Sequence, residues 1–137
     1  MSLPPPTAAA TAGASRFKSR PGWSRVRRAL GHSLRGLSAA WRHEAAFRQE
    51  VALGVPLVVL AWWLAATPLQ ALVLTAVIML VWIVELLNSA LEALADSVTL
   101  EQHPLIGRAK DIGSAAVMLA IALAATTWGV VLAARFA

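Results

Sequence analysis

The apolar residues of the chain first become periodic at Trp23. From there to about Glu44 they recur every three or four positions, and arginines occupy many of the positions between them. This spacing is typical of an amphipathic helix, and a basic polar face suits the surface of a membrane. The pattern therefore predicts an interfacial helix over about 23–44. Its apolar face consists of Trp23, Val26, Leu30, Leu34, Leu37 and Trp41.

A long apolar stretch without charged residues follows over residues 51–84. As one straight helix it would be about 50 Å long, well beyond the roughly 30 Å hydrocarbon core of a bilayer, so it must fold back on itself. The turn chemistry inside it is Ala66-Thr67-Pro68, where Thr67 can cap a helix and Pro68 suits its first turn. A further uncharged stretch begins at Ile112. The pattern predicts three membrane spans, over about 47–66, 68–96 and 112–134.

Basic residues gather on one side of these spans. Nine of the twelve Lys and Arg residues lie at or before Arg48, and two more lie in the polar segment 97–111, which we interpret as a loop. The tendency of basic residues to stay inside places the N-terminal arm and this loop in the cytoplasm, and the 66–68 turn outside. The basic arm carries no known nucleic-acid motif and membrane spans follow it at once, so we expect no nucleic-acid binding.

The composition also indicates a membrane protein. Of the 137 residues 58% are hydrophobic and 14% are charged, whereas ordinary soluble domains are roughly 45 to 50% apolar. The chain contains no Cys, which excludes disulfides and thiolate metal sites. A metal would have to be bound by carboxylates, His or backbone oxygens, which favours hard cations such as Mg²⁺. Residues 1–21, rich in Ala and Pro, are expected to form a disordered tail.

Polar residues occupy one face of the second predicted span. At 100° per residue the other four lie within about 60° of Glu85, and charged side chains in a span cost a few kcal/mol each and are usually functional. A purely structural interpretation is also open, with hydrogen bonds between helices and the carboxylates paired to Arg108 or Lys110. The five residues are Glu85, Asn88, Ser89, Glu92 and Asp96.

Other charged side chains are expected at the same membrane depth. Glu44 and Glu50 lie where the amphipathic arm meets the first span, and Lys110 and Asp111 lie where the polar segment meets the third. Carboxylates beside basic side chains suit Mg²⁺ that bridges phosphate groups. The usual Gly-rich nucleotide-binding motifs do not occur in the sequence, so a nucleotide site here would be unorthodox. Composition and periodicity alone leave a kinase and a transporter both open.

Three motifs add a resemblance to a known family. They are Glu44-Ala-Ala-Phe-Arg-Gln-Glu50, Ile83-Val-Glu-Leu-Leu-Asn-Ser-Ala-Leu-Glu92 and Gly107-Arg-Ala-Lys-Asp-Ile-Gly-Ser-Ala-Ala116. In this order, over about residues 23–134, they closely resemble the prokaryotic diacylglycerol kinase family. The resemblance implies an all-α membrane protein over residues 22–137, with an N-terminal amphipathic interfacial helix and three transmembrane helices in a trimeric helical bundle. It also implies a multi-pass protein of the bacterial inner membrane that makes phosphatidic acid from diacylglycerol and MgATP.

The resemblance further implies roles for individual residues. Glu85 would be the general base, supported by Asn88, and Glu44 and Glu92 would bind Mg²⁺. The implied nucleotide contacts are Arg25, His32, Glu44, Glu92, Glu101, Gln102, His103, Lys110 and Asp111. The implied lipid contacts are Arg25, Ala29, Leu30, Gly31, His32, Ser33, Leu34, Ser38, Ala39, Ala40, Trp41, Ala46, Phe47, Arg48, Gln49, Glu50, Glu85 and Ser114. This sequence departs from the family pattern at position 32, where it has His in place of the phenol side chain known from the family.

Two alternative functions remain: a kinase with another lipid substrate, and a transporter. An undecaprenol kinase shares the fold, and the sequence gives no clear indication of lipid-chain specificity. A small proton-coupled transporter would also place carboxylates inside the membrane, but it would have no need for Lys110 and Asp111 beside Glu92. The resemblance favours the diacylglycerol kinase.

Overall fold

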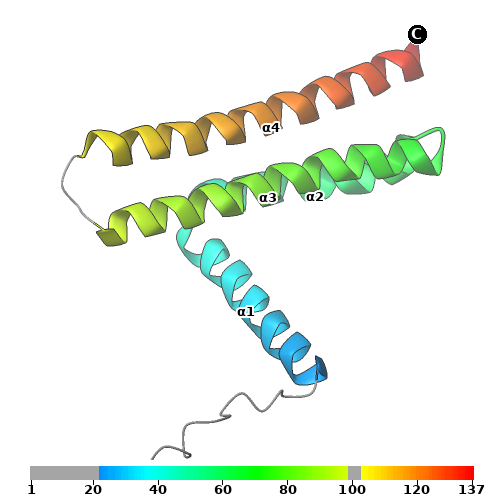
Figure 1. Cartoon of the computed structure of the whole chain (residues 1–137). Helices are drawn as coiled ribbons and strands as arrows, with labels where there is room; N and C mark the ends of the chain where they lie inside the picture. The colour runs from blue at the N-terminus through cyan, green and yellow to red at the C-terminus, as the bar shows by residue number, and fades with distance from the viewer. Residues whose placement is uncertain (1–21, 99–102) are drawn as a thin grey trace, which may run out of the picture. The chain divides into compact units, whose positions relative to one another are not determined.

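The computed structural model describes residues 22–98 and 103–137, and these form four helices with no strand among them. The helices are α1 (Gly22–His43), α2 (Ala45–Leu64), α3 (Pro68–Val98) and α4 (Pro104–Phe136) (Figure 1). The chain divides into two units, Met1–Arg35 and Gly36–Ala137, of which the second contains α2, α3 and α4. The predicted disordered tail over residues 1–21 lies outside the described residues.

The predicted amphipathic helix is confirmed as α1, within one residue of its expected bounds. Its apolar face is exposed in the single chain, from Trp23 near the start to Trp41 near the end. Arg42 and His43 occupy its last turn, where positive charge complements the helix dipole. A helix with an uncovered apolar face and an arginine-rich polar face is suited to a membrane surface.

The turn between α2 and α3 has the capping chemistry that the sequence predicts. Thr67 Oγ1 accepts a hydrogen bond of 3.2 Å from the backbone N–H of Gln70. The Gln70 side chain reaches back, and its Oε1 accepts a bond of 2.7 Å from the N–H of Ala66. Pro68 starts α3, where the missing N–H of proline costs nothing. The reciprocal bonds fix the point at which the long apolar stretch reverses direction.

The predicted loop over 97–111 is wrong for most of its length. Residues 97 and 98 continue α3, and residues 104–111 already belong to α4, which begins eight residues before the predicted third span. His103 caps α4, because its Nδ1 accepts a hydrogen bond of 3.3 Å from the N–H of Leu105, and Pro104 follows at the first helical position. The polar residues of this segment therefore extend a helix at the membrane boundary.

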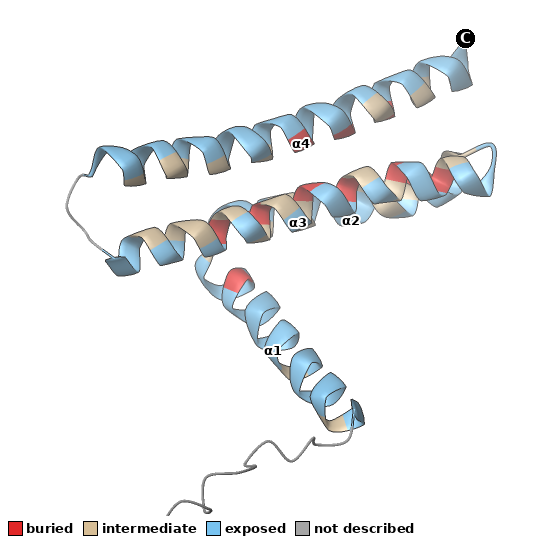
Figure 2. Ribbon diagram, in the orientation of Figure 1, coloured by how far each residue is buried: buried red, intermediate tan, exposed pale blue. Residues whose placement is uncertain are grey.

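α3 is the central helix of the second unit, since it packs against both α2 and α4. The buried residues of α3 follow one face at three- and four-residue spacing, and α4 adds Ala120, Ala124 and Trp128 (Figure 2). The C-terminal end of α4 and the α2–α3 turn lie at the same end of this unit (Figure 1). The buried face of α3 consists of Ala71, Leu74, Ile78, Val81, Glu85 and Ser89.

Three helices, α2, α3 and α4, are long and apolar enough to cross a membrane. At most 28% of the most apolar window of each helix is buried within the chain. The remaining apolar surface requires lipid or other protein around it, because water would not solvate so large an apolar area. The prediction of an all-α membrane protein is thus confirmed.

Candidate active site

The polar face of α3 continues the buried apolar face of the same helix. Glu85 is only 5% exposed and Ser89 only 8%, and they follow Val81 and Ile78 at helical spacing. A carboxylate at a buried position has lost much of its contact with water, so it needs a compensating partner or a function. Among the residues that the structure describes, Glu85 forms no ion pair. The buried carboxylate is therefore the centre of the candidate site.

Three other carboxylates lie close enough to Glu85 for their charges to repel its own. The charges of Glu92 and Glu44 act on Glu85, and Glu50 and Glu85 also repel each other. Glu44 is the single residue between α1 and α2, Glu50 lies on the second turn of α2, and Glu92 lies two turns beyond Glu85 on α3. The fold thus gathers four acidic side chains from two helices and a junction, as expected from their common membrane depth.

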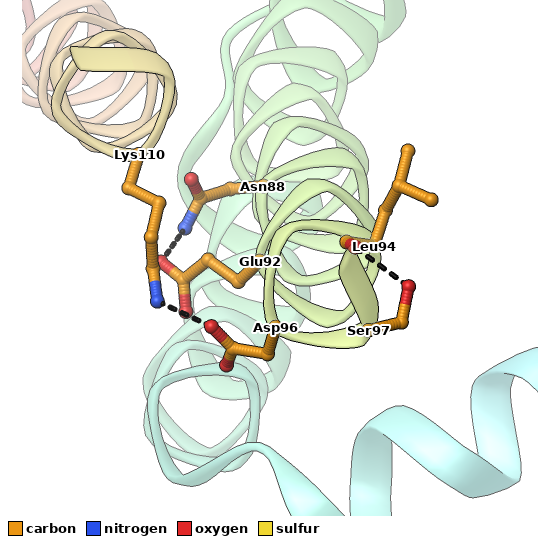
Figure 3. Close-up of polar contacts among 6 residues, drawn as sticks. All are labelled: Asn88, Glu92, Leu94, Asp96, Ser97 and Lys110. Atoms are coloured by element: carbon orange, nitrogen blue, oxygen red, sulfur yellow. Dashed lines mark hydrogen bonds and ion pairs between the residues drawn. The ribbon is translucent and has the colours of Figure 1, made fainter. Parts of the chain in front are cut away.

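Asn88 links the buried part of this face to Glu92. Its Nδ2 donates a hydrogen bond of 3.0 Å to Glu92 Oε1 (Figure 3). Its Oδ1, the Ser89 hydroxyl and Glu50 Oε2 are buried and have no hydrogen-bond partner within the described part of the chain. Buried oxygens of this kind usually have a partner, and each marks a place where a ligand could supply one.

Lys110 and Asp96 join the ends of α4 and α3. Lys110 Nζ lies 2.9 Å from Asp96 Oδ1, and Figure 3 shows the lysine side chain passing beside Glu92 on its way to Asp96. The two side chains are 37% and 57% exposed, so the pair is open to solvent. Among the described residues, the ion pair that the structural interpretation requires is formed with Asp96 at the end of the helix, and not with Glu85 or Glu92.

The predicted lipid contacts near Glu50 lie on the first turns of α2. Arg48 donates hydrogen bonds from one guanidinium nitrogen to the carbonyl oxygens of Trp41, at 3.1 Å, and Arg42, at 3.3 Å. These bonds tie the end of α1 to α2 across the Glu44 junction. Phe47 is buried, whereas Ala46 and Gln49 are exposed. Of the contacts predicted at the end of α1, Ala40 is buried, and Ser38 and Ala39 are exposed.

The predicted contacts from Arg25 to Leu34 belong to the unit Met1–Arg35, which is described by itself. Gly31 is half-buried, and Arg25 and the predicted lipid contacts Ala29, Leu30, His32, Ser33 and Leu34 are exposed. Ser33 donates to the Ala29 carbonyl oxygen at 3.1 Å. Arg35 Nη2 lies 2.9 Å from His32 Nδ1, and because a guanidinium can only donate, the ring nitrogen accepts.

Two predicted nucleotide contacts, Glu101 and Gln102, lie outside the described residues. His103 is exposed and caps α4, a role that the sequence interpretation missed and that Pro104 at the next position could have indicated. Asp111 and Ser114 are exposed on the early turns of α4. They lie on the same helix as Lys110, at the end of the unit that holds the acidic residues.

An apolar groove of about 350 Å³ is lined by residues of α2, α3 and α4, including Glu50, and was not predicted from the sequence. Trp82 lies beside Glu50 and donates from Nε1 to the Glu50 carbonyl oxygen at 3.1 Å. Gly54, one turn after Glu50, leaves room for the Trp82 ring, and this small residue in an apolar helix was the available signal. The groove is lined by Glu50, Leu53, Gly54, Leu57, Ile78, Val81, Trp82, Ile121, Ala124, Ala125, Trp128 and Leu132.

Comparison with known proteins gives a consistent result. Residues 31–132 match the family described as prokaryotic diacylglycerol kinase. A diacylglycerol kinase of Escherichia coli (strain K12) is 49% identical over 115 residues, which cover 84% of this chain and 94% of the relative. One from Pseudomonas aeruginosa is 48% identical over 118 residues, covering 86% and 96%. One from Haemophilus influenzae is 41% identical over 101 residues, covering 74% and 86%.

Proposed function

The chain belongs to the prokaryotic diacylglycerol kinase family, and we propose that it transfers the γ-phosphoryl group of ATP to the primary hydroxyl of diacylglycerol at the cytoplasmic face of the inner membrane. The product is phosphatidic acid. The observation that carries the proposal is the buried Glu85, which lies among three further carboxylates on one side of a three-span membrane unit.

Glu85 is the general base in this proposal. Its carboxylate is buried and forms no ion pair among the described residues, so it is available to accept a proton. The lipid hydroxyl oxygen forms a bond to the γ-phosphorus while the bond to the β,γ-bridging oxygen breaks and ADP leaves. The hydroxyl proton passes to Glu85, which requires the carboxylate within hydrogen-bonding reach of the hydroxyl.

Glu44 and Glu92 would bind Mg²⁺. The residues fit such an ion, because carboxylate oxygens are its preferred ligands and the carboxylates gathered here repel one another without a cation between them. Residues 22–98 and 103–137 hold no group of three or more His, Asp or Glu that could bind a metal alone. Two protein ligands suit a site that phosphate oxygens and water complete. When bound, the ion would neutralise negative charge on the transferring phosphoryl group.

Lys110 would supply positive charge to the phosphates of the nucleotide. The Lys110 side chain lies beside that of Glu92 (Figure 3). Its ion-pair partner Asp96 is solvent-exposed, so this ion pair can be exchanged for a phosphate at little cost. Asp111 follows on the same helix turn. Further nucleotide contacts are proposed for Arg25, His32, Glu101, Gln102 and His103, and Ser114 is proposed as a lipid contact.

The lipid would approach Glu85 from within the membrane. The groove has Glu50 in a lining that is otherwise apolar, and Glu50 also belongs to the Ala46–Glu50 stretch for which lipid contacts are proposed. An acyl chain in this groove would place the glycerol end of the lipid at the depth of the carboxylates. Arg25, residues 29–34 and residues 38–41 are proposed as further lipid contacts.

A homotrimer would cover part of the apolar surface that one chain leaves exposed. Most of the apolar windows of α2, α3 and α4 remain unburied in the single chain. Helix association in membranes depends on close packing of such faces. The predicted orientation, with the N-terminus and the α3–α4 connection in the cytoplasm, puts the acidic cluster on the side where ATP is found.

Phosphorylation by the purified protein in mixed micelles tests the proposal. Dioleoylglycerol and undecaprenol are offered together with ATP, with Mg²⁺ present or chelated. We expect phosphatidic acid as the product and no product after chelation. Phosphorylated undecaprenol alone would move the assignment to an undecaprenol kinase. The absence of any lipid product would contradict the kinase assignment and direct attention to transport in sealed vesicles.

A further inference from the structure

Gly113 on α4 lies directly against Asn88 on α3. A Cβ atom at Gly113 would collide with Asn88 Oδ1 and would lie 3.4 Å from Asn88 Cγ and 3.8 Å from Leu91 Cδ2. The other glycines of α4, Gly107 and Gly129, have open space at the same position. The close approach is therefore a property of the Gly113 site and does not occur along the whole helix.

The orientation of the Asn88 amide is set by Glu92. Nδ2 donates to Glu92 Oε1 at 3.0 Å, and an ionised carboxylate can only accept, so the amide cannot turn over without losing this bond. The amide oxygen then has to face α4, where it is buried without a partner in the described part of the chain. Because Gly113 has only a hydrogen atom in place of a side chain, there is room for this oxygen.

We propose that Gly113 is a positioning residue that acts through Asn88 on Glu92. A methyl group at position 113 would meet the end of a movable side chain, so Asn88 would turn away while the helices kept their packing. Glu92 would then lose the amide hydrogen bond that fixes its carboxylate. The inference rests on the proposed function, in which Glu92 binds Mg²⁺, because hydrogen-bonding partners of metal ligands tune metal affinity.

The first test compares Gly113→Ala with Gly129→Ala, which makes the same substitution on the same helix where space is open. We expect the Mg²⁺ concentration for half-maximal activity to rise roughly 10- to 100-fold in Gly113→Ala. The KM for diacylglycerol should stay unchanged. Binding of Mn²⁺ with a non-hydrolysable ATP analogue, measured by electron paramagnetic resonance, should weaken by a similar factor. Gly129→Ala should match the parent protein in all three measurements.

A double variant separates this route from a general disturbance. If Gly113→Ala acts through Asn88, adding it to Asn88→Ala should change the Mn²⁺ affinity by less than about twofold, because the two effects are not independent. If the losses of Mn²⁺ affinity in the two single variants multiplied in the double variant, the two substitutions would act independently and the inference would be overturned. A Gly113→Ala protein with normal Mn²⁺ affinity would also overturn it.

Failure of the proposed function would look different. In that case the parent protein itself would neither phosphorylate lipid nor bind Mn²⁺ with the nucleotide analogue. The contact between Gly113 and Asn88 can still be measured, since thermal unfolding of the two single variants and the double variant gives their coupling without any ligand. Coupling in unfolding without an effect on metal binding would contradict the positioning role.

Discussion

Replacing Gly54 with Ala should destabilise the membrane unit, because the methyl group has no room. A Cβ atom there would lie 2.6 Å from Trp82 Cζ2, 2.8 Å from Ile78 Cγ2 and 2.9 Å from Trp82 Cε2. The Trp82 ring cannot easily yield, because its Nε1 donates to the Glu50 carbonyl oxygen on the same helix as Gly54. The added methyl group therefore has to push α2 and α3 apart or break this bond.

The magnitude follows from three contributions. Overpacking of a filled site costs typically 1–3 kcal/mol. A displaced indole would lose a hydrogen bond of about 1 kcal/mol. Replacing Gly by Ala inside a helix stabilises the helix by roughly 0.5–1 kcal/mol, which offsets part of the loss. We expect Gly54→Ala to lower the free energy of unfolding by about 2 kcal/mol, with the loss arising at the α2–α3 contact.

Equilibrium unfolding in detergent micelles measures this change against Gly129→Ala. Gly129 has open space at the Cβ position, so its substitution gains helix propensity without a clash and should be neutral or stabilising. Adding Trp82→Phe to Gly54→Ala should recover part of the loss, since the smaller ring leaves more room. Equal stability of Gly54→Ala and Gly129→Ala would refute the packing argument.

Two further substitutions test the ends of the helices. Thr67→Ala removes the cap of α3 and should lower the free energy of unfolding by about 1 kcal/mol. The KM values for ATP and for diacylglycerol should not change, as measured by steady-state kinetics. An unchanged stability would show that Gln70 alone holds the turn. Lys110→Gln should raise the KM for ATP by about tenfold or more, because a charged hydrogen bond to phosphate is worth roughly 1.5–3 kcal/mol. A change confined to the lipid KM would contradict the assigned role.

Much of the fold could be predicted because membrane thickness and helix geometry limit the possibilities. The stretch 51–84 is too long for one span, and Thr67 and Pro68 supply the turn at which it reverses. The prediction of a loop over residues 97–111 was wrong, because polar residues alone do not end a helix at the membrane boundary. At this boundary the backbone N–H and C=O groups of a helix form hydrogen bonds with each other, and its polar side chains reach water. Pro104, as a first helical residue, was the available signal.

The candidate site could be predicted in part for a similar reason. Residues on one helix have a fixed angular relation, so the shared face of Glu85 and Glu92 follows from their spacing. Contacts between helices depend on how the helices are offset, which a single sequence does not encode in any simple pattern. The contact of Gly54 with Trp82, and that of Gly113 with Asn88, therefore emerged only from the structure.

The most direct test of the central claim is the activity of Glu85→Gln. The substitution keeps the size of the side chain and removes the carboxylate that would accept the proton of the lipid hydroxyl. Phosphorylation of dioleoylglycerol in mixed micelles is measured beside the parent protein, with thermal unfolding and oligomeric state recorded for both. We predict that turnover falls by at least about 100-fold while stability and assembly are retained. Full activity in Glu85→Gln would contradict the account.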